Sequence, residues 1–275
     1  MSMSSPSSFP IFHVDAFAER PFAGNPAAVV PLDGPLSDPL MQDIAAQNNL
    51  SETAFFHRQG AGADGAVYNL RWFTPTVEVD LCGHATLASA FVLMTELDPT
   101  RVEVTFRTRS GLLVVRRHGD LYELDFPAFP AVAPREPMAA VAAALGATPV
   151  EILRARAWLA VFPDAAAIRA LTPDMAALRR LDTTVCVTAP GAGEAHDLDF
   201  VCRYFAPTAG IPEDPVTGSA FCTLIPYWAA RLGKERLRAR QLSRRTGEVY
   251  GQLASDGRVR IAGRARLVIK GTFSC

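Results

Sequence analysis

The sequence predicts an α+β protein of two pseudo-symmetric domains, each a curled β-sheet or barrel around a central α-helix. Three observations predict this fold class. A short phrase occurs twice along the chain, an almost wholly apolar stretch follows each copy, and short segments separated by turn residues follow each apolar stretch. Because a repeated unit dictates the architecture, two copies indicate two facing halves.

The two copies share spacing as well as composition. In each, an aromatic residue opens a Pro-Thr turn, a Cys or Asp follows nine positions later, and a Gly-containing passage comes next. The copies read Phe73-Thr74-Pro75-Thr76 with Cys82 and Gly83-His84-Ala85, and Phe205-Ala206-Pro207-Thr208 with Asp214 and Gly218-Ser219-Ala220. Upstream, the first half places Glu52 where the second places Thr183. Any acid/base role of that position therefore falls on the first half.

The first half begins with two short strands, Ile11–Phe17 and Ala27–Val30, separated by a Gly-Asn turn. Ser37 is a favourable N-cap for a helix whose apolar residues share one face, and Asn48-Asn49 is a plausible left-handed stop. Glu52 then stands at the mouth of a strand over 53–56. A carboxylate at that point can face a cleft.

Two apolar segments, Ala85–Met94 and Ala220–Leu232, predict helices buried on all sides, since nearly every position is apolar or small. Leu171-Thr172 predicts the opening of a further helix, the counterpart of the one after Ser37. Later strands end at Gly/Asp hairpin signals. The Pro-rich stretch 127–137 predicts the linker between domains 1–128 and 129–275, with the last strand packing back on the first half.

Composition limits the classes of partner. The 27 basic and 28 acidic residues give a net charge of -1, which argues against nucleic acid and anionic membranes and favours a small molecule. Five cysteines without a Cys-x-x-Cys pair and five histidines without metal spacing indicate neither disulfides nor a metal site. With no targeting segment or apolar run of membrane length, we expect a cytoplasmic protein.

The helix starts at Gly83-His84 and Gly218-Ser219 predict a binding site, because free N–H groups and the positive end of the helix dipole attract a carboxylate or an enolate oxygen. Glu52 is the leading general acid/base. We expect burial to disfavour its charged form and to raise its pKa. A single Gly-Ser at a helix start is more often structural, but the duplicated arrangement reverses that preference. For a lone Glu, a surface position at a strand end is the more common alternative.

Two further features have plain alternatives. Cys82 matches Asp214 in the repeat, so the two could act as a pair of bases, although a buried Cys is more often inert core. The basic run from Arg231 to Arg245 contains Arg236, Arg238 and Arg240 alternating with apolar residues. That alternation is typical of the outer face of a half-buried strand, and a phosphate-binding patch is the less favoured alternative.

The chain resembles the PhzF family of phenazine-biosynthesis isomerases over nearly its whole length. The segments that carry the resemblance are Asp15-Ala16-Phe17, Phe22-Ala23-Gly24-Asn25-Pro26, Asn49-Leu50-Ser51-Glu52-Thr53, Phe73-Thr74-Pro75, Leu81-Cys82-Gly83-His84-Ala85-Thr86 and Glu213-Asp214-Pro215-Val216-Thr217-Gly218-Ser219-Ala220. The resemblance implies a diaminopimelate-epimerase-like fold with the site in the cleft between the halves. It also implies a cofactor-free proton shift on a small carboxylate-bearing substrate, and a homodimer.

The residue roles follow from the same resemblance. It implies Glu52, His84 and Asp214 as catalytic residues, and Gly83, Gly218, Ser219 and Asn25 as substrate-binding residues. No metal and no cofactor are implied. The sequence departs from the family at Phe221, where many relatives carry His, and at Thr246, in a segment where Gly-Gly is common. It also departs at Cys82, where the phenazine enzyme itself has a small apolar residue and the related epimerases place a catalytic Cys.

Three hypotheses follow. The first is a cofactor-independent isomerase that moves a proton with Glu52 as the acid/base. The second is a two-base racemase or epimerase that uses Cys82 and Asp214. The third is a non-catalytic protein that binds a carboxylate metabolite.

Overall fold

The structure is a computed structural model that describes residues 8–59, 67–135, 138–192 and 197–274. Residues 1–7, Pro137, His196 and Cys275 therefore lie outside the described residues. The chain divides into two compact units, the first comprising 1–124 and 263–275 and the second comprising 125–262. We expected the division after residue 128, and it falls between Leu124 and Asp125. The C-terminal strand belongs to the first unit.

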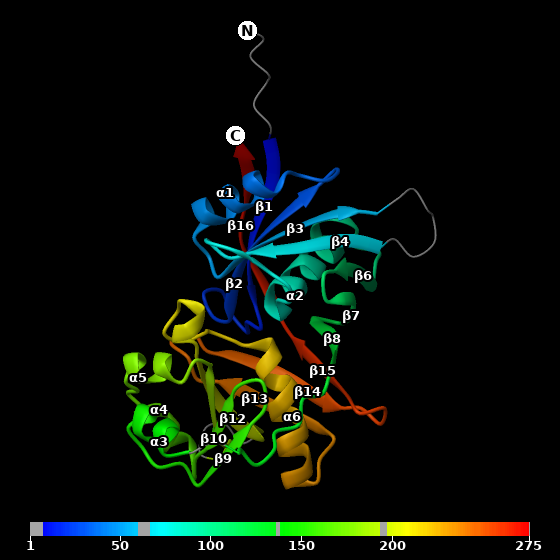
Figure 1. Ribbon diagram of the computed structural model, residues 1–275. Coiled ribbons are helices and arrows are strands. Elements are labelled where there is room, and N and C mark those ends of the chain that lie inside the picture. Colours follow the sequence, from blue (N-terminus) through cyan, green and yellow to red (C-terminus); the bar gives the residue numbers. More distant parts are fainter. Residues whose placement is uncertain (1–7, 60–66, 136–137, 193–196, 275) are drawn as a thin grey trace. The chain divides into compact units, whose positions relative to one another are not determined.

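The first unit contains a curled sheet in the order β16-β1-β2-β3-β4-β6-β7-β8. Its strands are β1 (Ser8–Ala16), β2 (Asn25–Leu32), β3 (Glu52–Arg58), β4 (Val67–Phe73), β6 (Glu103–Thr108), β7 (Gly111–His118), β8 (Leu121–Pro127) and β16 (Ala265–Ser274), with the short β5 (Glu78–Val79) beside β4. Neighbours are antiparallel except for the pairs β2·β3 and β4·β6. The C-terminal strand thus completes the sheet beside the first strand, as Figure 1 shows.

Two helices pack on this sheet. Helix α1 (Asp38–Asn48) packs through Met41, Ile44 and Ala45 on strand residues that all point to one face, because strand side chains alternate between faces. Helix α2 (Gly83–Val92) continues into a π-helical turn, η1 (Leu93–Leu97). Eight of its ten residues are buried, and it packs on β1, β2 and β3. The expected helix buried on all sides is therefore present.

The chain reaches the start of β3 through a left-handed stop. Asn49 has φ 49° and donates its N–H to the carbonyl of Ala45, so α1 ends where the Asn pair predicted. At the other end, Ser37 has an extended backbone but its side chain makes no cap hydrogen bond. Before β2, Gly24 has φ 66°, and a Cβ there would collide with the carbonyl oxygen of Ala16. This close approach requires glycine immediately before Asn25.

The second unit contains the sheet order β15-β14-β13-β12-β11-β10-β9. Its strands are β9 (Glu151–Arg154), β10 (Trp158–Val161), β11 (Val185–Pro190), β12 (Phe200–Phe205), β13 (Arg236–Gln241), β14 (Gly247–Leu253) and β15 (Arg258–Gly263). Its helices are α3 (Ala139–Leu145), α4 (Ala165–Ala170), α5 (Met175–Arg180) and α6 (Gly218–Leu232), with a 3-10 turn η2 (Pro207–Ala209). The helix expected to open at Leu171-Thr172 begins later, because Asp174 provides the side-chain cap of α5.

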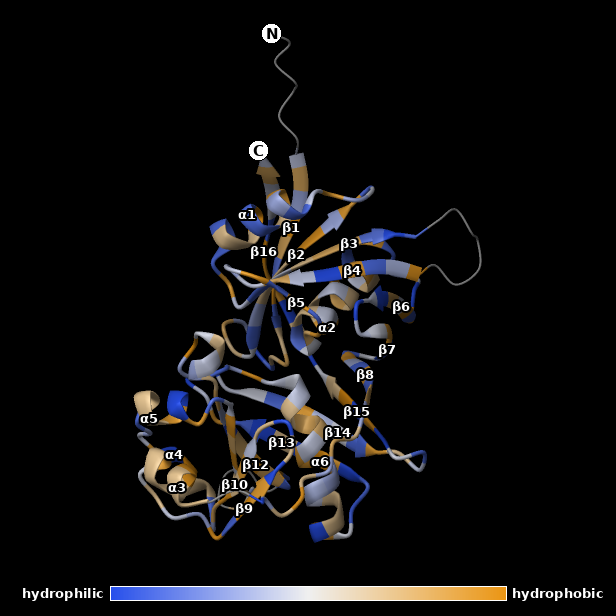
Figure 2. Ribbon diagram, viewed as in Figure 1, coloured by the Kyte–Doolittle hydropathy of each residue, from blue (hydrophilic) through white to orange (hydrophobic). Residues whose placement is uncertain are grey.

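The short helices and the long helix of this unit pack mainly against different strands. The short helices α3, α4 and α5 share an apolar cluster with β10, β11 and β12, and α3 and α4 fall in the hydrophobic range of Figure 2. The long helix α6 packs on β13 and β14. Its Trp228 stacks on Phe200 at 5.6 Å and donates Nε1–H to Thr188. As in the first unit, a largely apolar helix packs against the sheet, but α6 is not buried on all sides as expected, because Ala230, Arg231 and Leu232 at its end are exposed.

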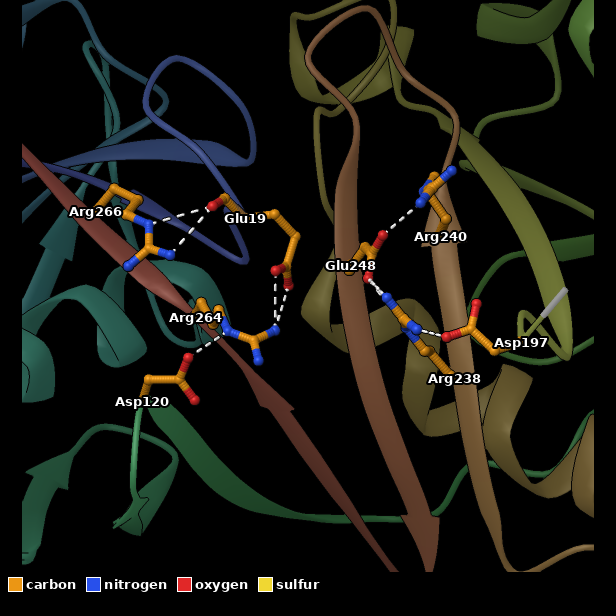
Figure 3. Close-up of polar contacts among 8 residues, drawn as sticks. All are labelled: Glu19, Asp120, Asp197, Arg238, Arg240, Glu248, Arg264 and Arg266. Carbon is orange, nitrogen blue, oxygen red and sulfur yellow. Dashed lines mark hydrogen bonds and ion pairs between the residues drawn. The ribbon is translucent and has the colours of Figure 1, made fainter. Parts of the chain in front are cut away.

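The outer face of β13 carries charges, as the alternating basic run predicted. Arg238 and Arg240 both bind the nearly buried Glu248 of β14, at 2.6 Å and 2.5 Å, and Arg238 also contacts Asp197 (Figure 3). Burial alone would raise the pKa of Glu248, but these two guanidinium groups hold it below its ordinary value. The basic residues at 238 and 240 are therefore neutralised within the sheet.

A second ion-pair cluster belongs to the first unit. Arg264 contacts Glu19 at 2.7 Å and Asp120 at 2.5 Å, and Arg266 donates to the backbone carbonyl of Glu19 (Figure 3). These contacts join the C-terminal segment to the loop after β1. Among the described residues, no helix is long and apolar enough to cross a membrane.

Candidate functional site

The first group of predicted site residues lies in the first unit, where β2, β3 and α2 begin. Asn25 opens β2, Glu52 opens β3, and His84 is the second residue of α2. Parallel pairing of β2 with β3 sets Ala27 opposite Glu52, so the two strand starts lie side by side. Residues distant in sequence are brought together because three elements begin at one place.

Glu52 and His84 form a close pair. The Oε2 atom of Glu52 lies 3.1 Å from Nε2 of His84, and the two side chains are 18% and 7% exposed. Neither atom has a hydrogen-bond partner among the described residues, because the approach is short but not aligned for a hydrogen bond. Oε2 of Glu52 and Nε2 of His84 are therefore two buried polar atoms that make no hydrogen bond to another described residue.

Cys82 lies on the other side of the imidazole. Its Sγ is 3.5 Å from Nδ1 of His84, and the residue is the N-cap of α2 without a side-chain cap bond. Its backbone carbonyl instead accepts the hydroxyl of Thr86 at 2.5 Å. The thiol is nearly buried. Cys82, His84 and Glu52 thus form one contiguous cluster, which the sequence could not show because Glu52 lies thirty positions upstream.

Asn25 contacts the His84 ring of this cluster. It is fully buried, its Nδ2 lies 3.3 Å from Nδ1 of His84, and its Oδ1 accepts the hydroxyl of Ser51 at 3.2 Å. The resemblance implied that Asn25 binds substrate. Its burial and its contacts instead favour a role in orienting the His84 ring. Ser51, which we did not single out, takes part because it precedes Glu52 directly.

The charges of the cluster are coupled. Burial raises the pKa of Glu52, but the charge of His84 together with the polar contacts of His84 and Cys82 holds it below its ordinary value. Burial lowers the pKa of His84, but Cys82 and Glu52 raise it well above the ordinary value. The expectation of a raised pKa for Glu52 is therefore wrong, because it considered burial without the partner.

Cys82 behaves differently from its neighbours. Burial raises the pKa of its thiol, and the charge of Glu52 raises it further, against a smaller opposing effect of His84. The Glu52 carboxyl is accordingly ionised and faces the Nε2 of His84, beside a thiol that keeps its proton. Glu52 starts in the form that can accept a proton.

These three residues also have the composition of a metal site. Among the described residues, Glu52, Cys82 and His84 are the one group of three donors whose atoms lie within 4.8 Å of one another. Zinc accepts this donor set. An ion bound there would have to displace a proton from His84, whose pKa Cys82 and Glu52 raise.

The second group lies in the second unit. Asp214 follows β12, Gly218 opens α6, and Ser219 is exposed as its second residue. The carboxylate of Asp214 accepts the hydroxyl of Thr217 at 2.5 Å, and its backbone N–H donates to Tyr204. Asp214, Gly218 and Ser219 are thus neighbours in one turn and helix start.

The departures from the family have structural roles. Phe221 is fully buried and its ring lies 6.1 Å from that of Phe200, so it is a core residue of α6. Thr246 has φ 56°, a left-handed conformation, in the turn before β14. Sequence reasoning missed Gln241, the buried residue that ends β13 and contacts both Asp214 and Thr217. No local pattern marks it.

Comparison with known proteins identifies the family of this chain. The sequence pattern of the family described as phenazine biosynthesis-like protein, PhzC-PhzF, matches residues 14–271. The protein named "Uncharacterized isomerase PA2770" from Pseudomonas aeruginosa is 50% identical over 267 residues, which are 96% of this chain and 98% of that one.

Solved structures extend the comparison to the fold. The crystal structure of a phenazine biosynthesis protein of the PhzF family from Enterococcus faecalis has a TM-score of 0.90 and 44% identity, and the match covers 97% of this chain and 99% of that one. A hydroxyproline epimerase from Agrobacterium vitis, at 12% identity and a TM-score of 0.57 over 97% of this chain and 92% of that one, shares the fold alone. The fold is the epimerase-like α+β fold, and the chain belongs to the phenazine biosynthesis-like PhzC-PhzF family.

Proposed function

We propose that this protein is a cofactor-independent isomerase that moves a proton between two carbons of a small carboxylate-bearing metabolite, with Glu52 as the general acid/base. The family and its named relatives support an isomerase or epimerase of the PhzF type. The observation that carries the finer proposal is the Glu52–His84 pair. Both facing atoms are buried, 3.1 Å apart and without a hydrogen bond.

The proton is taken and returned by one carboxyl group. The Glu52 carboxylate removes a proton from a carbon made acidic by the carboxylate of the substrate, and the electron pair left behind moves into an enolate. The protonated Glu52 then gives a proton to a second carbon of the same delocalised system. One C–H bond breaks and another forms, so the reaction consumes no oxidant, reductant or second substrate.

The charge of the intermediate is stabilised by the start of α2. The imidazolium of His84 lies directly beside Glu52, and the free N–H groups at Gly83 and its neighbours add the positive end of the helix dipole. Asp214 is proposed to assist in proton handling and substrate binding, and Gly218 and Ser219 are proposed to bind substrate. Preorganised charge of this kind is worth on the order of 100- to 1,000-fold per group.

A second candidate rests on the contact between Cys82 and His84. A two-base racemase or epimerase would use Cys82 as one base and Asp214 as the other, and a thiol 3.5 Å from an imidazole can pass its proton to that ring. The pKa of Cys82 is raised by burial and by the charge of Glu52, which disfavours the thiolate in the resting protein. Glu52 is therefore the preferred base.

The proposal is tested by proton NMR in heavy water on a panel of small carboxylic acids that includes dihydro-hydroxyanthranilate. Deuterium should enter a C–H position with the wild type. With Glu52→Gln, turnover should fall on the order of 100- to 10,000-fold, the usual contribution of a positioned acid/base. The matched control is Glu103→Gln, a half-exposed Glu on β6 of the same unit that pairs with Arg116, and it should retain full turnover.

Three outcomes separate the candidates. Unchanged turnover in Glu52→Gln removes the proposed acid/base. Loss of turnover in Cys82→Ser, together with inactivation by thiol alkylation, transfers the role to the two-base reaction. Saturable binding of a carboxylate without deuterium uptake across the panel supports a binding protein instead. Chelation of metal ions should leave deuterium uptake unchanged.

A further inference from the structure

Gln241 is a fully buried amide whose side chain bonds the Asp214 turn, and its Oε1 also faces the thiol of Cys202 at 3.9 Å. It ends β13 and is 0% exposed. A buried carboxamide costs free energy unless its donors and acceptor are satisfied. Gln241 is satisfied by a segment that lies 24 to 27 residues upstream. Its burial is therefore explained by that turn.

The amide holds both ends of the turn. Its Oε1 accepts the backbone N–H of Thr217 at 2.9 Å, and its Nε2 donates to the backbone carbonyl of Asp214 at 2.7 Å. Donor and acceptor of one side chain thus join the first and last residues of the segment 214–217. A side chain with only one of these functions could not do so.

Thr217 passes this constraint to the carboxylate. As the N-cap of α6, it makes no side-chain cap bond to the helix. Its hydroxyl instead donates to Oδ2 of Asp214 at 2.5 Å, and Nε2 of Gln241 lies 3.3 Å from the same hydroxyl oxygen. The hydroxyl is therefore oriented by Gln241 toward the Asp214 carboxylate, because its oxygen faces one donor and its hydrogen one acceptor.

The connection after β13 adds a second support. The hydroxyl of Ser243 donates to the carbonyl of Pro215 at 2.7 Å. In the first repeat, a similar serine bond links Ser110 to the carbonyl of Asp80 before α2. Gln241 ends β13 and pairs with Gly247, and the residue that ends β6 and pairs with Gly111 in the first repeat is Thr108, a shorter side chain. The amide support is therefore particular to the second repeat.

We propose that Gln241 is a positioning residue that fixes the Asp214 carboxylate and the start of α6 through Thr217. Its consequence for turnover rests on the proposed function, in which Asp214 binds substrate. Its structural content does not, because the Thr217 N–H and the Asp214 carboxyl can be observed directly.

The test compares Gln241→Met, which keeps the volume and removes both hydrogen bonds, with Gln241→Glu and with the control Gln252→Met on the partly exposed face of β14. Amide hydrogen exchange by NMR reports the Thr217 N–H. In Gln241→Met its protection should fall about tenfold or more, the effect of losing one buried hydrogen bond. Gln252→Met should leave it unchanged.

Gln241→Glu should restore the two hydrogen bonds only when its carboxyl group is protonated. At neutral pH its carboxylate accepts the Thr217 N–H but repels the Asp214 carbonyl. When protonated, it has one O–H donor and one acceptor, as glutamine does. Burial raises the pKa of such a carboxyl, so the rescue should begin in mildly acidic solution. Recovery of Thr217 protection as the pH falls distinguishes positioning by hydrogen bonds from simple filling of space, which would not depend on pH.

Turnover provides the second reading. With a substrate from the heavy-water panel, Gln241→Met should lower kcat roughly 10- to 100-fold with a smaller change in KM, and Gln241→Glu should recover in parallel with its Thr217 protection. Lost protection with unchanged kcat and KM overturns the positioning role. Unchanged protection in a folded Gln241→Met overturns the hydrogen-bond assignment itself.

The two proposals can fail separately. If the wild type exchanges no substrate hydrogen, the proposed function fails, and the carbon-13 resonance of the Asp214 carboxyl decides the positioning role. A resonance that moves in Gln241→Met and returns in Gln241→Glu at low pH supports it, and an unmoved resonance overturns it. If Gln241→Met does not fold, Gln241→Glu carries the same comparison between neutral and acidic solution.

Discussion

The starts of α2 and α6 have the same place in the repeat but different chemistry. At the start of α2, the side chains of Cys82, His84 and the nearby Glu52 are all titratable and nearly buried. At the start of α6, Asp214 is supported by the hydroxyl of Thr217 and by the neutral amide of Gln241. The two copies thus share a scaffold. The first copy places titratable side chains at its helix start, whereas the second supports Asp214 with a neutral hydroxyl and a neutral amide.

The shared scaffold includes an arginine that the sequence comparison did not single out. Arg71 and Arg203 each stand two positions before the repeated Phe, and each binds a glutamate with two hydrogen bonds, Glu78 and Glu213 respectively. Each guanidinium also lies over the ring of its own Phe, at 5.1 Å and 4.8 Å. Both pairs fix the segment that leads to the helix start. Their recurrence teaches that this support is common, whereas the titratable cluster belongs to one copy.

The comparison predicts unequal effects at the second position of each helix. His84→Gln should lower turnover roughly 100-fold, because it removes a buried charge beside Glu52. Ser219→Ala should lower turnover less than about tenfold, because an exposed hydroxyl contributes a single neutral hydrogen bond. Steady-state rates of both variants on one substrate check this.

The outcome bears directly on the division of roles. Equal losses in the two variants would mean that both helix starts carry the chemistry, which favours the two-base reaction. A larger loss in Ser219→Ala would place the main catalytic group in the second unit. The exposed Glu103→Gln variant serves again as the control for handling and purity.

The buried pair should also leave a signature in stability. The folded-state pKa of Glu52 is lowered, so its contribution is present above its unfolded value of about 4.3 and is lost as pH falls through the folded value. The folded-state pKa of His84 is raised, so its contribution is fully present below its unfolded value of about 6.5 and is lost as pH rises through the folded value. Both contributions coexist between about pH 4.3 and pH 6.5.

The expected difference in unfolding free energy between wild type and Glu52→Gln is about 3–5 kcal/mol in that window, the usual cost of removing one partner of a buried ion pair. It should shrink toward alkaline pH as His84 loses its proton. Denaturant unfolding at several pH values measures it, with the transition of the first unit followed separately if the two units unfold apart. A difference that stays constant from pH 5 to pH 10 would contradict the coupled pair.

The sequence predicted those elements that have strong local signals. The double Asn that ends α1, the apolar helices α2 and α6, and the alternating basic strand β13 all rest on periodicity or turn chemistry. Strands β9 and β10 were not predicted, because they lie upstream of Leu171, where the compared passage of the second half begins. The helix expected at Leu171-Thr172 starts later, after its cap Asp174.

The sequence identified residues of the candidate site but not the contacts between them. The repeat singled out His84 and Cys82, and the unmatched Glu52 followed from comparing the halves. Their mutual contact depends on parallel pairing of β2 with β3, which no local pattern specifies. The direction of the Glu52 pKa shift was wrong for the same reason, since the opposing charge belongs to a residue thirty-two positions away. Gln241 was missed because its partners lie 24 to 27 residues upstream.

The turns after β6 and β13 provide the smallest expected effect. In the first repeat the left-handed residue is Gly111, with φ 102°, whereas in the second it is Thr246, with φ 56°. A left-handed conformation costs a residue with a Cβ about 1–2 kcal/mol. Thr246→Gly removes that cost but adds about 0.4–1 kcal/mol of unfolded-chain entropy. The net expectation is a gain of about 0.5–1 kcal/mol, or roughly 1–4 °C in Tm.

Ser110→Gly at the matching position provides the control. Ser110 is not among the left-handed residues of the described chain, so glycine there relieves no strain and removes the hydroxyl bond to the Asp80 carbonyl. Thermal unfolding should therefore move in opposite directions for the two variants. A stabilised Ser110→Gly together with a destabilised Thr246→Gly would mean that Thr246 is held left-handed by contacts worth more than its strain, and that the second turn, like the amide of Gln241, is part of what fixes the Asp214 segment.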